Sequence, residues 1–137
     1  MMRSTITVIV GILLGRLTTG LLGMVGHALY PPPADLALEG MDEAWRQFMA
    51  GAPTGMFLAL LLAGAGGAFV GGLVAALLSE RRRILHALAV GAIQTGFAAV
   101  QFQMVPHPLW FTVLGVTVLL PAAGLAGLLV GREPEPA

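Results

Sequence analysis

The sequence predicts an all-α integral membrane protein, a four-transmembrane-helix bundle with a short amphipathic helix between the first and second spans. Hydrophobic residues make up 57% of the chain and charged residues 10%, whereas a soluble domain carries about 25% charged residues. A helix needs about 20 mostly apolar residues to cross a bilayer. Four stretches reach that length, at residues 4–29, 53–78, 84–104 and 109–130. We expect residues 1–137 to form a single domain.

The start of the first span is similar to a secretory signal peptide, because Arg3 precedes the apolar run 6–14. The apolar pattern continues well past Arg16, however, and no clear Ala-x-Ala cleavage site follows it. We therefore expect the first stretch to be retained as a transmembrane helix.

The segment 31–52 is expected to leave the membrane and then to form a helix on its surface. Pro31–Pro33 enforce a stiff, extended exit from the first span. After Gly40, apolar residues recur at helical spacing with polar residues between them; they are Met41, Trp45, Phe48 and Met49 against Asp42, Glu43, Arg46 and Gln47. Such an amphipathic helix fits a lid over the helix ends better than it fits a partner-binding helix.

The stretch VPHPLWF, residues 105–111, predicts a tight turn between the third and fourth spans. Proline ends one helix and can begin the next, because the first turn of a helix needs no N–H donor. Aromatic side chains near span ends favour the headgroup boundary. Tyr30, Trp45 and Trp110 are therefore the expected interfacial anchors.

The arginines indicate an orientation. Arg81–Arg83 fill the short connection between the second and third spans, and cytoplasmic loops carry such an excess of positive charge. This places both termini in the cytoplasm, with Arg3 and Arg132. The segment 31–52 is then outside, where Asp35, Glu39, Asp42 and Glu43 stand against a single Arg46.

The second span carries two adjacent faces of small residues. One face comprises Gly64, Ala68, Gly72 and Ala76, and the other comprises Gly67, Gly71 and Ala75. Small side chains let helix backbones approach closely, so this helix is expected to be central to the bundle. Besides the lipid bilayer, the same faces are candidate contacts for a homo-oligomer or a membrane-protein partner.

Arg16 is predicted close to the midplane of the membrane, counting about 1.5 Å of rise per residue from the inner face. An unpaired arginine there costs at least ~2.5 kcal/mol on insertion scales, and no Asp or Glu lies within any predicted span. Gln94 lies at nearly the same depth, as does the carbonyl of Thr117, which Pro121 deprives of its usual donor. Arg16, Gln94 and Thr117 are the candidate intramembrane polar site; the alternative is an Arg16 that snorkels from a tilted helix.

His27, near the outer end of the first span, and His107, in the outer turn, are expected on the same side of the membrane as the acidic segment 35–43. Two imidazoles and a carboxylate can bind Zn²⁺ or another divalent metal ion. The alternative is that each histidine is an interfacial anchor or bonds a loop carbonyl. No other cofactor is expected.

Several function classes are excluded or unsupported. The formal net charge is zero, which leaves no basic footprint for nucleic acid. The absence of cysteine excludes disulfides, thiolate metal sites and cysteine nucleophiles. The sequence contains no H-E-x-x-H, no G-x-S-x-G and no phosphate loop, so no enzyme is predicted.

The stretches GHALYPPP (26–33) and VPHPLWF (105–111) resemble an uncharacterised family of small bacterial four-span integral membrane proteins. The resemblance covers most of the chain, including the glycine-rich second span and LLPAAGLAG at 119–127. It implies a four-helix bundle in the bacterial cytoplasmic (inner) membrane, and it implies no activity. His27, Tyr30, His107 and Trp110 match the patterns, whereas Arg16 belongs to none of them.

Three functions follow from these observations. The first is a non-enzymatic structural, accessory or partner-binding subunit, favoured if the interior voids are filled by glycine and alanine. The second is a small transporter or channel component with a polar path past Arg16, Gln94, Thr95 and Gln101. The third is a metal-binding protein with an outward site at His27 and His107. A continuous path would favour the second function, and convergent histidine rings the third.

Overall fold

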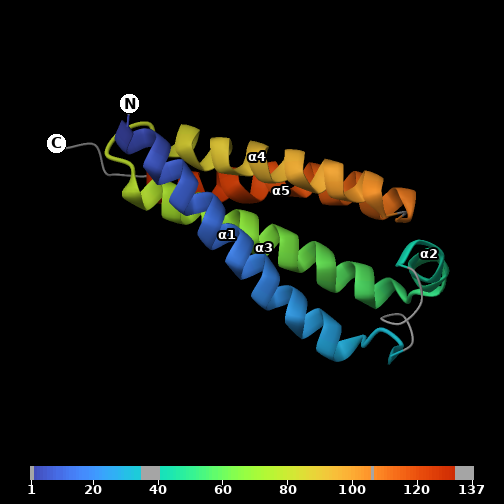
Figure 1. Ribbon diagram of the computed structural model, residues 1–137. Helices are drawn as coiled ribbons and strands as arrows, with labels where there is room; N and C mark the ends of the chain where they lie inside the picture. The colour runs from blue at the N-terminus through green and yellow to red at the C-terminus, as the bar shows by residue number, and fades with distance from the viewer. Residues whose placement is uncertain (1, 35–40, 106, 132–137) are drawn as a thin grey trace.

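The computed structural model describes residues 2–34, 41–105 and 107–131, and within these ranges it contains helices and no strand. The helices are α1 (Met2–Leu29), α2 (Met41–Gly51), α3 (Thr54–Leu78), α4 (Arg83–Met104) and α5 (Leu109–Gly131) (Figure 1). All but α2 are long and apolar enough to cross a membrane. The four predicted stretches are helical, and each helix begins and ends within two residues of the predicted boundaries.

The surfaces of the four long helices are apolar. Large hydrophobic side chains are exposed on each of them, including Leu13 at 63%, Leu62 at 72%, Val100 at 60% and Leu129 at 62%. In water each such side chain would forgo about 1.5–3 kcal/mol of burial free energy, whereas lipid imposes no such cost. The exposed surface therefore supports a multi-pass membrane protein.

The long helices lie close together at one end of the molecule and spread apart toward α2 (Figure 1). The helix α3 packs against α1, α4 and α5, and α4 runs beside α5. Contact between α1 and α4 lies in the first half of α1, where a Cβ on Gly11 would be 3.0 Å from Val90 Cγ2. Beyond Gly15 the two helices separate, which leaves room between them toward α2.

Four glycines bring the backbones of α1 and α3 into direct contact. A Cβ on Gly71 would lie 2.6 Å from the Gly11 carbonyl oxygen, and one on Gly67 would lie 2.6 Å from the Gly15 carbonyl oxygen. The reverse approaches, from Gly11 and Gly15 to the α3 carbonyls, are both 2.7 Å. Only glycine fits at such a crossing, because any Cβ would overlap backbone that cannot move away.

The face of α3 that carries Gly64, Ala68, Gly72 and Ala76 packs on α5. A Cβ on Gly72 would lie 2.9 Å from Ala123 Cα, and Ala68 is fully buried in a cluster with Ala123 and Leu119. The central position predicted for α3 is confirmed. Within the described chain, α1 and α5 occupy these two faces.

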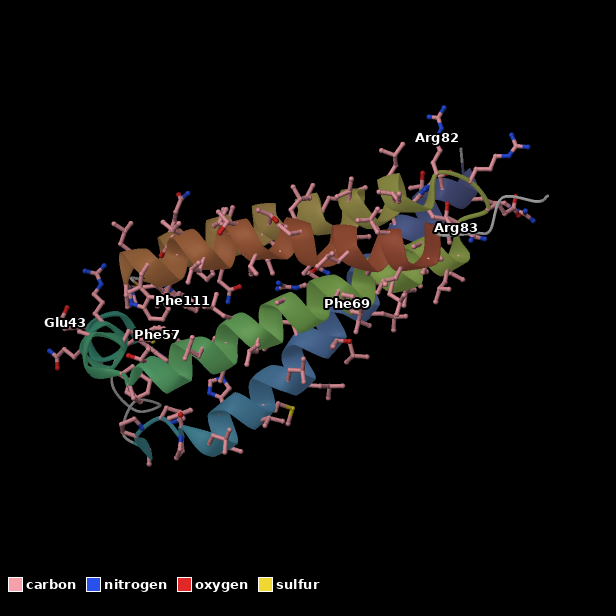
Figure 2. All side chains as sticks on the ribbon, turned by 180° about the vertical axis from the view of Figure 1, so that it is seen from behind. Glu43, Phe57, Phe69, Arg82, Arg83 and Phe111 are labelled. Atoms are coloured by element: carbon pink, nitrogen blue, oxygen red, sulfur yellow. The ribbon has the colours of Figure 1, made fainter. Side chains whose placement is uncertain are left out.

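The arginine-rich elements meet at the end of the molecule opposite α2 (Figure 2). Arg3 Nη1 donates to Glu80 Oε1 at 2.7 Å, and Arg83 Nη1 donates to the Val130 carbonyl at 3.2 Å. The start of α1, the α3–α4 connection and the end of α5 therefore share one end, as the topology predicts. Arg132 lies outside the described residues.

The short helix α2 lies at the other end and presents its apolar side to α3 and α5. Met49 is 5% exposed and belongs to a cluster with Met56, Phe57 and Phe111. Trp45 and Phe48 are half-buried against this cluster, whereas the polar side chains Glu43, Arg46 and Gln47 are exposed. The amphipathic pattern of α2 thus closes the spread end of the molecule with apolar side chains.

Candidate functional site

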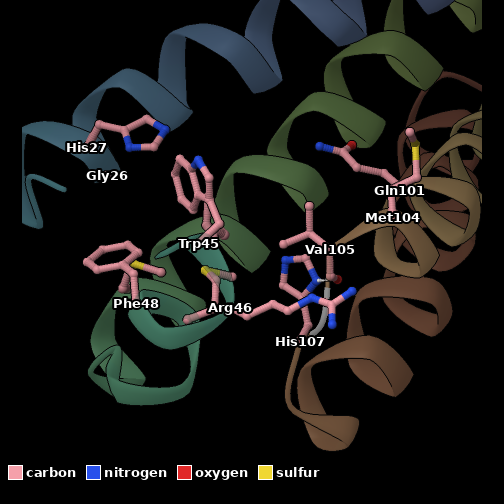
Figure 3. A pocket seen from close by; sticks show the side chains of 12 residues that line it. Gly26, His27, Trp45, Arg46, Phe48, Gln101, Met104, Val105 and His107 are labelled. Carbon is pink, nitrogen blue, oxygen red and sulfur yellow. Dashed lines mark hydrogen bonds between the residues drawn. The ribbon is translucent and has the colours of Figure 1, made fainter. Parts of the chain in front are cut away.

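A cavity of about 410 Å³ lies under α2, between α1, α3 and α4. We call it the α2-end cavity (Figure 3). It is lined by Gly26, His27, Trp45, Arg46, Phe48, Met49, Met56, Leu60, Gln101, Met104, Val105 and His107. The walls combine three methionines, Trp45, Phe48, Leu60 and Val105 with two histidines, one arginine and one glutamine as polar groups.

An aromatic cluster supports the wall that carries His107. The His107 ring is stacked on Phe111 with centroids 5.1 Å apart, and it meets the edge of Phe102 at 5.1 Å. Phe57 joins the cluster 5.2 Å from Phe111, and Trp110 lies 5.9 Å from Phe57. The helix α3 contributes Phe57, α4 contributes Phe102, and α5 contributes Phe111, so this cluster ties three spans together at one depth.

The backbone fixes the tautomer of His107. Its Nδ1 lies 2.6 Å from the carbonyl oxygen of Val105, which can only accept, so Nδ1 carries the proton that is donated. Burial among the rings lowers the pKa of His107 below its ordinary value of 6.5, and the Val105 hydrogen bond offsets part of that effect. At neutral pH the ring is therefore neutral and its Nε2 is an acceptor. The neighbouring Pro106 of the predicted turn lies outside the described residues.

The lowered pKa of His107 predicts that the protein loses stability in acid. In the unfolded chain His107 binds a proton near pH 6.5, whereas in the folded chain it does so only at lower pH. The stability present above pH 6.5 therefore declines as the pH falls below that value. The melting temperature should drop between about pH 7 and pH 5. His107→Gln should weaken this dependence, whereas His27→Gln should preserve it. An unchanged pH profile in His107→Gln would contradict the assignment.

A second cavity, of about 150 Å³, continues from the first toward the middle of the molecule. We call it the Arg16 cavity. Leu60, Gln101 and His107 line both cavities, so the two adjoin at these side chains. The deeper part is lined by Arg16 and Thr19 of α1, by Gln94 of α4, and by Gly115 and Leu119 of α5. These shared side chains place the Arg16 cavity next to the α2-end cavity.

Arg16 has no anionic partner among the described residues. Its guanidinium carbon lies 5.6 Å from the centre of the Phe97 ring, a cation–π contact, and it has no hydrogen bond to any residue that the structure describes. A cation–π contact of this kind is worth roughly 0.5–2 kcal/mol. That is less than the cost of at least ~2.5 kcal/mol for placing an arginine at the centre of a span. The charge of Arg16 is therefore incompletely compensated.

Gln94 also lines the Arg16 cavity, and its amide carries a second unpartnered donor among the described residues. Its side chain is 4% exposed, and its Nε2 is buried with no hydrogen-bond partner within the described part of the chain. A Cβ on Gly15 would collide with this Nε2, and one on Gly71 would lie 3.1 Å from it. The two glycines thus make room for the amide as well as for the helix crossing. Leaving a buried amide unpaired costs about 1–3 kcal/mol.

The predicted site is brought together in part. Arg16 and Gln94 line one cavity, although no hydrogen bond between them is found among the described residues. Thr117 is not among the residues that line this cavity. Its side chain is exposed, and its Oγ1 donates to the Val113 carbonyl of the same helix at 2.7 Å.

The predicted metal site is not assembled within the described ranges. His27 and His107 lie on opposite walls of the α2-end cavity, with Trp45 and Arg46 between them (Figure 3). No group of three or more His, Asp or Glu side chains that could hold a metal ion occurs among the described residues. Asp35, Glu39 and the side chain of Asp42 lie outside the described part of the chain.

The three predicted anchors differ in their surroundings. Trp110 is 39% exposed at the start of α5, as an interfacial residue would be. The hydroxyl of Tyr30 lies over Gly55 at the start of α3. Trp45 instead lines the α2-end cavity and packs edge-on against Phe48, with ring centroids 5.7 Å apart. Trp45 is therefore a cavity residue as well as a candidate anchor.

Sequence reasoning missed Phe57, Phe102 and Arg46 as parts of the site. The two phenylalanines lie about one turn inside the α2-facing ends of their spans, at the depth of Trp110 and Phe111. Their shared depth was a usable signal for an aromatic cluster. Arg46 could be assigned only to the polar side of α2, because its position at the cavity depends on how α2 docks.

Comparison of the chain with models of protein families, with curated proteins and with solved structures finds no match. The geometry of the two cavities therefore has to support the functional proposal by itself.

Proposed function

We propose that this protein is a non-enzymatic, four-helix protein of the bacterial cytoplasmic membrane that binds a small anionic ligand. In this proposal it is a small transporter or a component of a channel. One observation carries the proposal. Arg16 and Gln94 line the cavity that adjoins the α2-end cavity, and the Arg16 guanidinium and the Gln94 amide nitrogen have no hydrogen-bond acceptor among the described residues.

The charges that line the two cavities favour an anion as the ligand. Arg16 lines the deep cavity and Arg46 lines the cavity under α2, and no Asp or Glu within the described ranges lines either one. The neutral state of His107 adds no charge at the point where the cavities adjoin. In a medium of low dielectric constant an anion beside Arg16 would both neutralise the cation and accept from Gln94.

The proposed topology places α2 on the outer side and both termini in the cytoplasm, because the arginine-rich connection marks the cytoplasmic end. Single cysteines in place of Arg82 and Ala34, both exposed and at opposite ends, should report this. In intact cells the cysteine at 34 should react with a membrane-impermeant thiol reagent and the one at 82 should not. The reverse pattern would contradict the orientation.

The ligand is tested by thermal unfolding in nanodiscs of zwitterionic phosphatidylcholine, with acetate, benzoate, decanoate and inorganic phosphate as probes. At least one anion should raise the melting temperature, because binding to the folded state at a hundred times Kd adds about 2.7 kcal/mol of stability. Arg16→Gln should abolish the rise. Arg81→Gln, an exposed position that lines neither cavity, should retain it.

The structural or accessory function predicts a different result from the same experiment. In that case no anion would stabilise the wild type in a manner that depends on Arg16, and Arg16→Gln would change only the stability of the protein alone. That outcome would overturn the proposed binding function.

A further inference from the structure

We infer that the ligand is an amphiphilic monoanion, with a carboxylate head at Arg16 and Gln94 and an apolar chain in the α2-end cavity. The inference rests on the proposed function and adds the class of ligand and its direction in the site. It follows from the division of polar and apolar side chains between the two cavities.

The Arg16 cavity fits a ligand head group with one negative charge. Arg16 is the one cation among the described residues that line it, and Gln94 supplies the one buried amide donor without a partner. A guanidinium can bond both oxygens of a carboxylate, and the amide can donate to the outer lone pair of either oxygen. A dianion such as phosphate would bring a second charge to a site that supplies no second cation there.

The α2-end cavity fits an apolar chain. At about 410 Å³ it is the larger of the two, and its apolar lining includes Trp45, Phe48, Met49, Met56 and Met104. Methionine side chains are flexible and adapt to chains of different shape. Arg16 and His27 of α1, which mark the two cavities, are roughly 16 Å apart along the helix at 1.5 Å per residue. An extended chain with its head at Arg16 would therefore reach the space under α2.

The membrane gives such a ligand a route to the site. Arg16 lines the cavity and is nevertheless exposed, and its partner ring Phe97 is 53% exposed. Arg16 follows Gly15 and Phe97 follows Gln94, the pair at which α1 and α4 approach closely. Toward α2 the two helices spread apart (Figure 1). An amphiphile dissolved in the bilayer can approach Arg16 between these two helices without crossing water.

The direction of the ligand is tested with Trp45 as the reporter. The chain has two tryptophans, and Trp110→Phe leaves Trp45 alone beside the α2-end cavity. This variant in phosphatidylcholine nanodiscs is titrated with decanoate that carries bromine, a short-range quencher, either at its methyl end or beside its carboxylate. Methyl-end bromine should quench Trp45 several-fold more strongly, and Arg16→Gln should remove the difference between the two probes.

The class of ligand is tested by comparing decanoate with acetate, benzoate, decanol and a decyl trimethylammonium ion. Against its aqueous concentration, decanoate should bind more tightly than acetate by about fourfold for each methylene group buried, the equivalent of ~0.8 kcal/mol per group. Decanol and the ammonium ion should give no shift in melting temperature that depends on Arg16.

The outcomes separate this inference from the proposed function. Equal, Arg16-dependent stabilisation by acetate, benzoate and decanoate would overturn the amphiphile and leave the anion site standing. Stronger quenching by bromine beside the carboxylate would overturn the direction, since the head would then lie under α2. No Arg16-dependent response to any anion would overturn both.

Discussion

Gly67→Ala is expected to lower the melting temperature by roughly 10 °C, the equivalent of about 3 kcal/mol, at the upper end of the range for overpacking. The added Cβ would lie 2.6 Å from the Gly15 carbonyl oxygen and would also collide with Thr19 Oγ1. The hydroxyl can rotate, but the carbonyl belongs to the backbone of α1 and can yield only if the helix moves. Thermal unfolding in phosphatidylcholine nanodiscs measures the effect.

Gly20→Ala and Gly23→Ala are the matched controls. Both glycines lie on α1, and a Cβ at either position would meet nothing within 4 Å among the described residues. Alanine favours a helix by about 1 kcal/mol relative to glycine, so these variants should be as stable as the wild type or slightly more stable. If they lose as much stability as Gly67→Ala, the close crossing of α1 and α3 is contradicted.

Gln94→Met is expected to raise the stability of the ligand-free protein by about 1–3 kcal/mol, the cost of an unpaired buried amide. Methionine is unbranched and of similar length, so it should fit in the space that Gly15 and Gly71 leave for the glutamine side chain. The same variant should lose the stabilisation by anions, because the donor is gone. A gain in stability together with a loss of binding would show that Gln94 serves ligand binding at a cost in stability.

Gln103→Met provides the control for this prediction. Gln103 is an exposed residue of the same helix and lines neither cavity. Its replacement removes an amide without removing a buried donor, so stability and the anion response should both stay near those of the wild type. A fall in stability on Gln94→Met would mean that the amide has a partner in the folded protein, which would remove the main support for the anion site.

The boundaries of the four spans could be read from the sequence because crossing a bilayer is a local requirement. Each span must satisfy its own backbone hydrogen bonds and supply its own length of apolar residues, whatever its neighbours do. The connection at Arg81–Arg83 and the turn around His107 follow from residues adjacent in the chain. No long-range contact is needed to place either one.

The position of α3 was predictable only in part. Its two faces of small residues indicated close packing on both sides, and the structure confirms this. Which helix covers each face depends on Gly11 and Gly15 on one side and on Ala123 on the other. Those residues are distant in sequence, and small residues alone carry no information about their partners.

The candidate site shows the same division between depth and direction. Counting residues places Arg16, Gln94 and Thr117 at similar depths, because the rise of a helix is constant. Depth does not fix the rotation of a helix about its axis. Packing of Leu119 and Ala123 against α3 turns α5 so that Gly115 and Leu119 line the cavity, while the Thr117 side chain remains exposed.

The sequence by itself determined the class of the protein, its four apolar helices, the shared end of Arg3 and Arg81–Arg83, and the turn that holds His107. The tertiary structure decided that the His107 ring stacks on Phe111 and that His27 lies across a cavity from it. It also decided that Arg16 and Gln94 line one cavity, with no hydrogen-bond acceptor for either side chain among the described residues. The physical reason is that hydropathy and turn chemistry act between neighbours in the chain. Cavities and unpaired donors arise from the fit of helices whose contacts are distant in sequence.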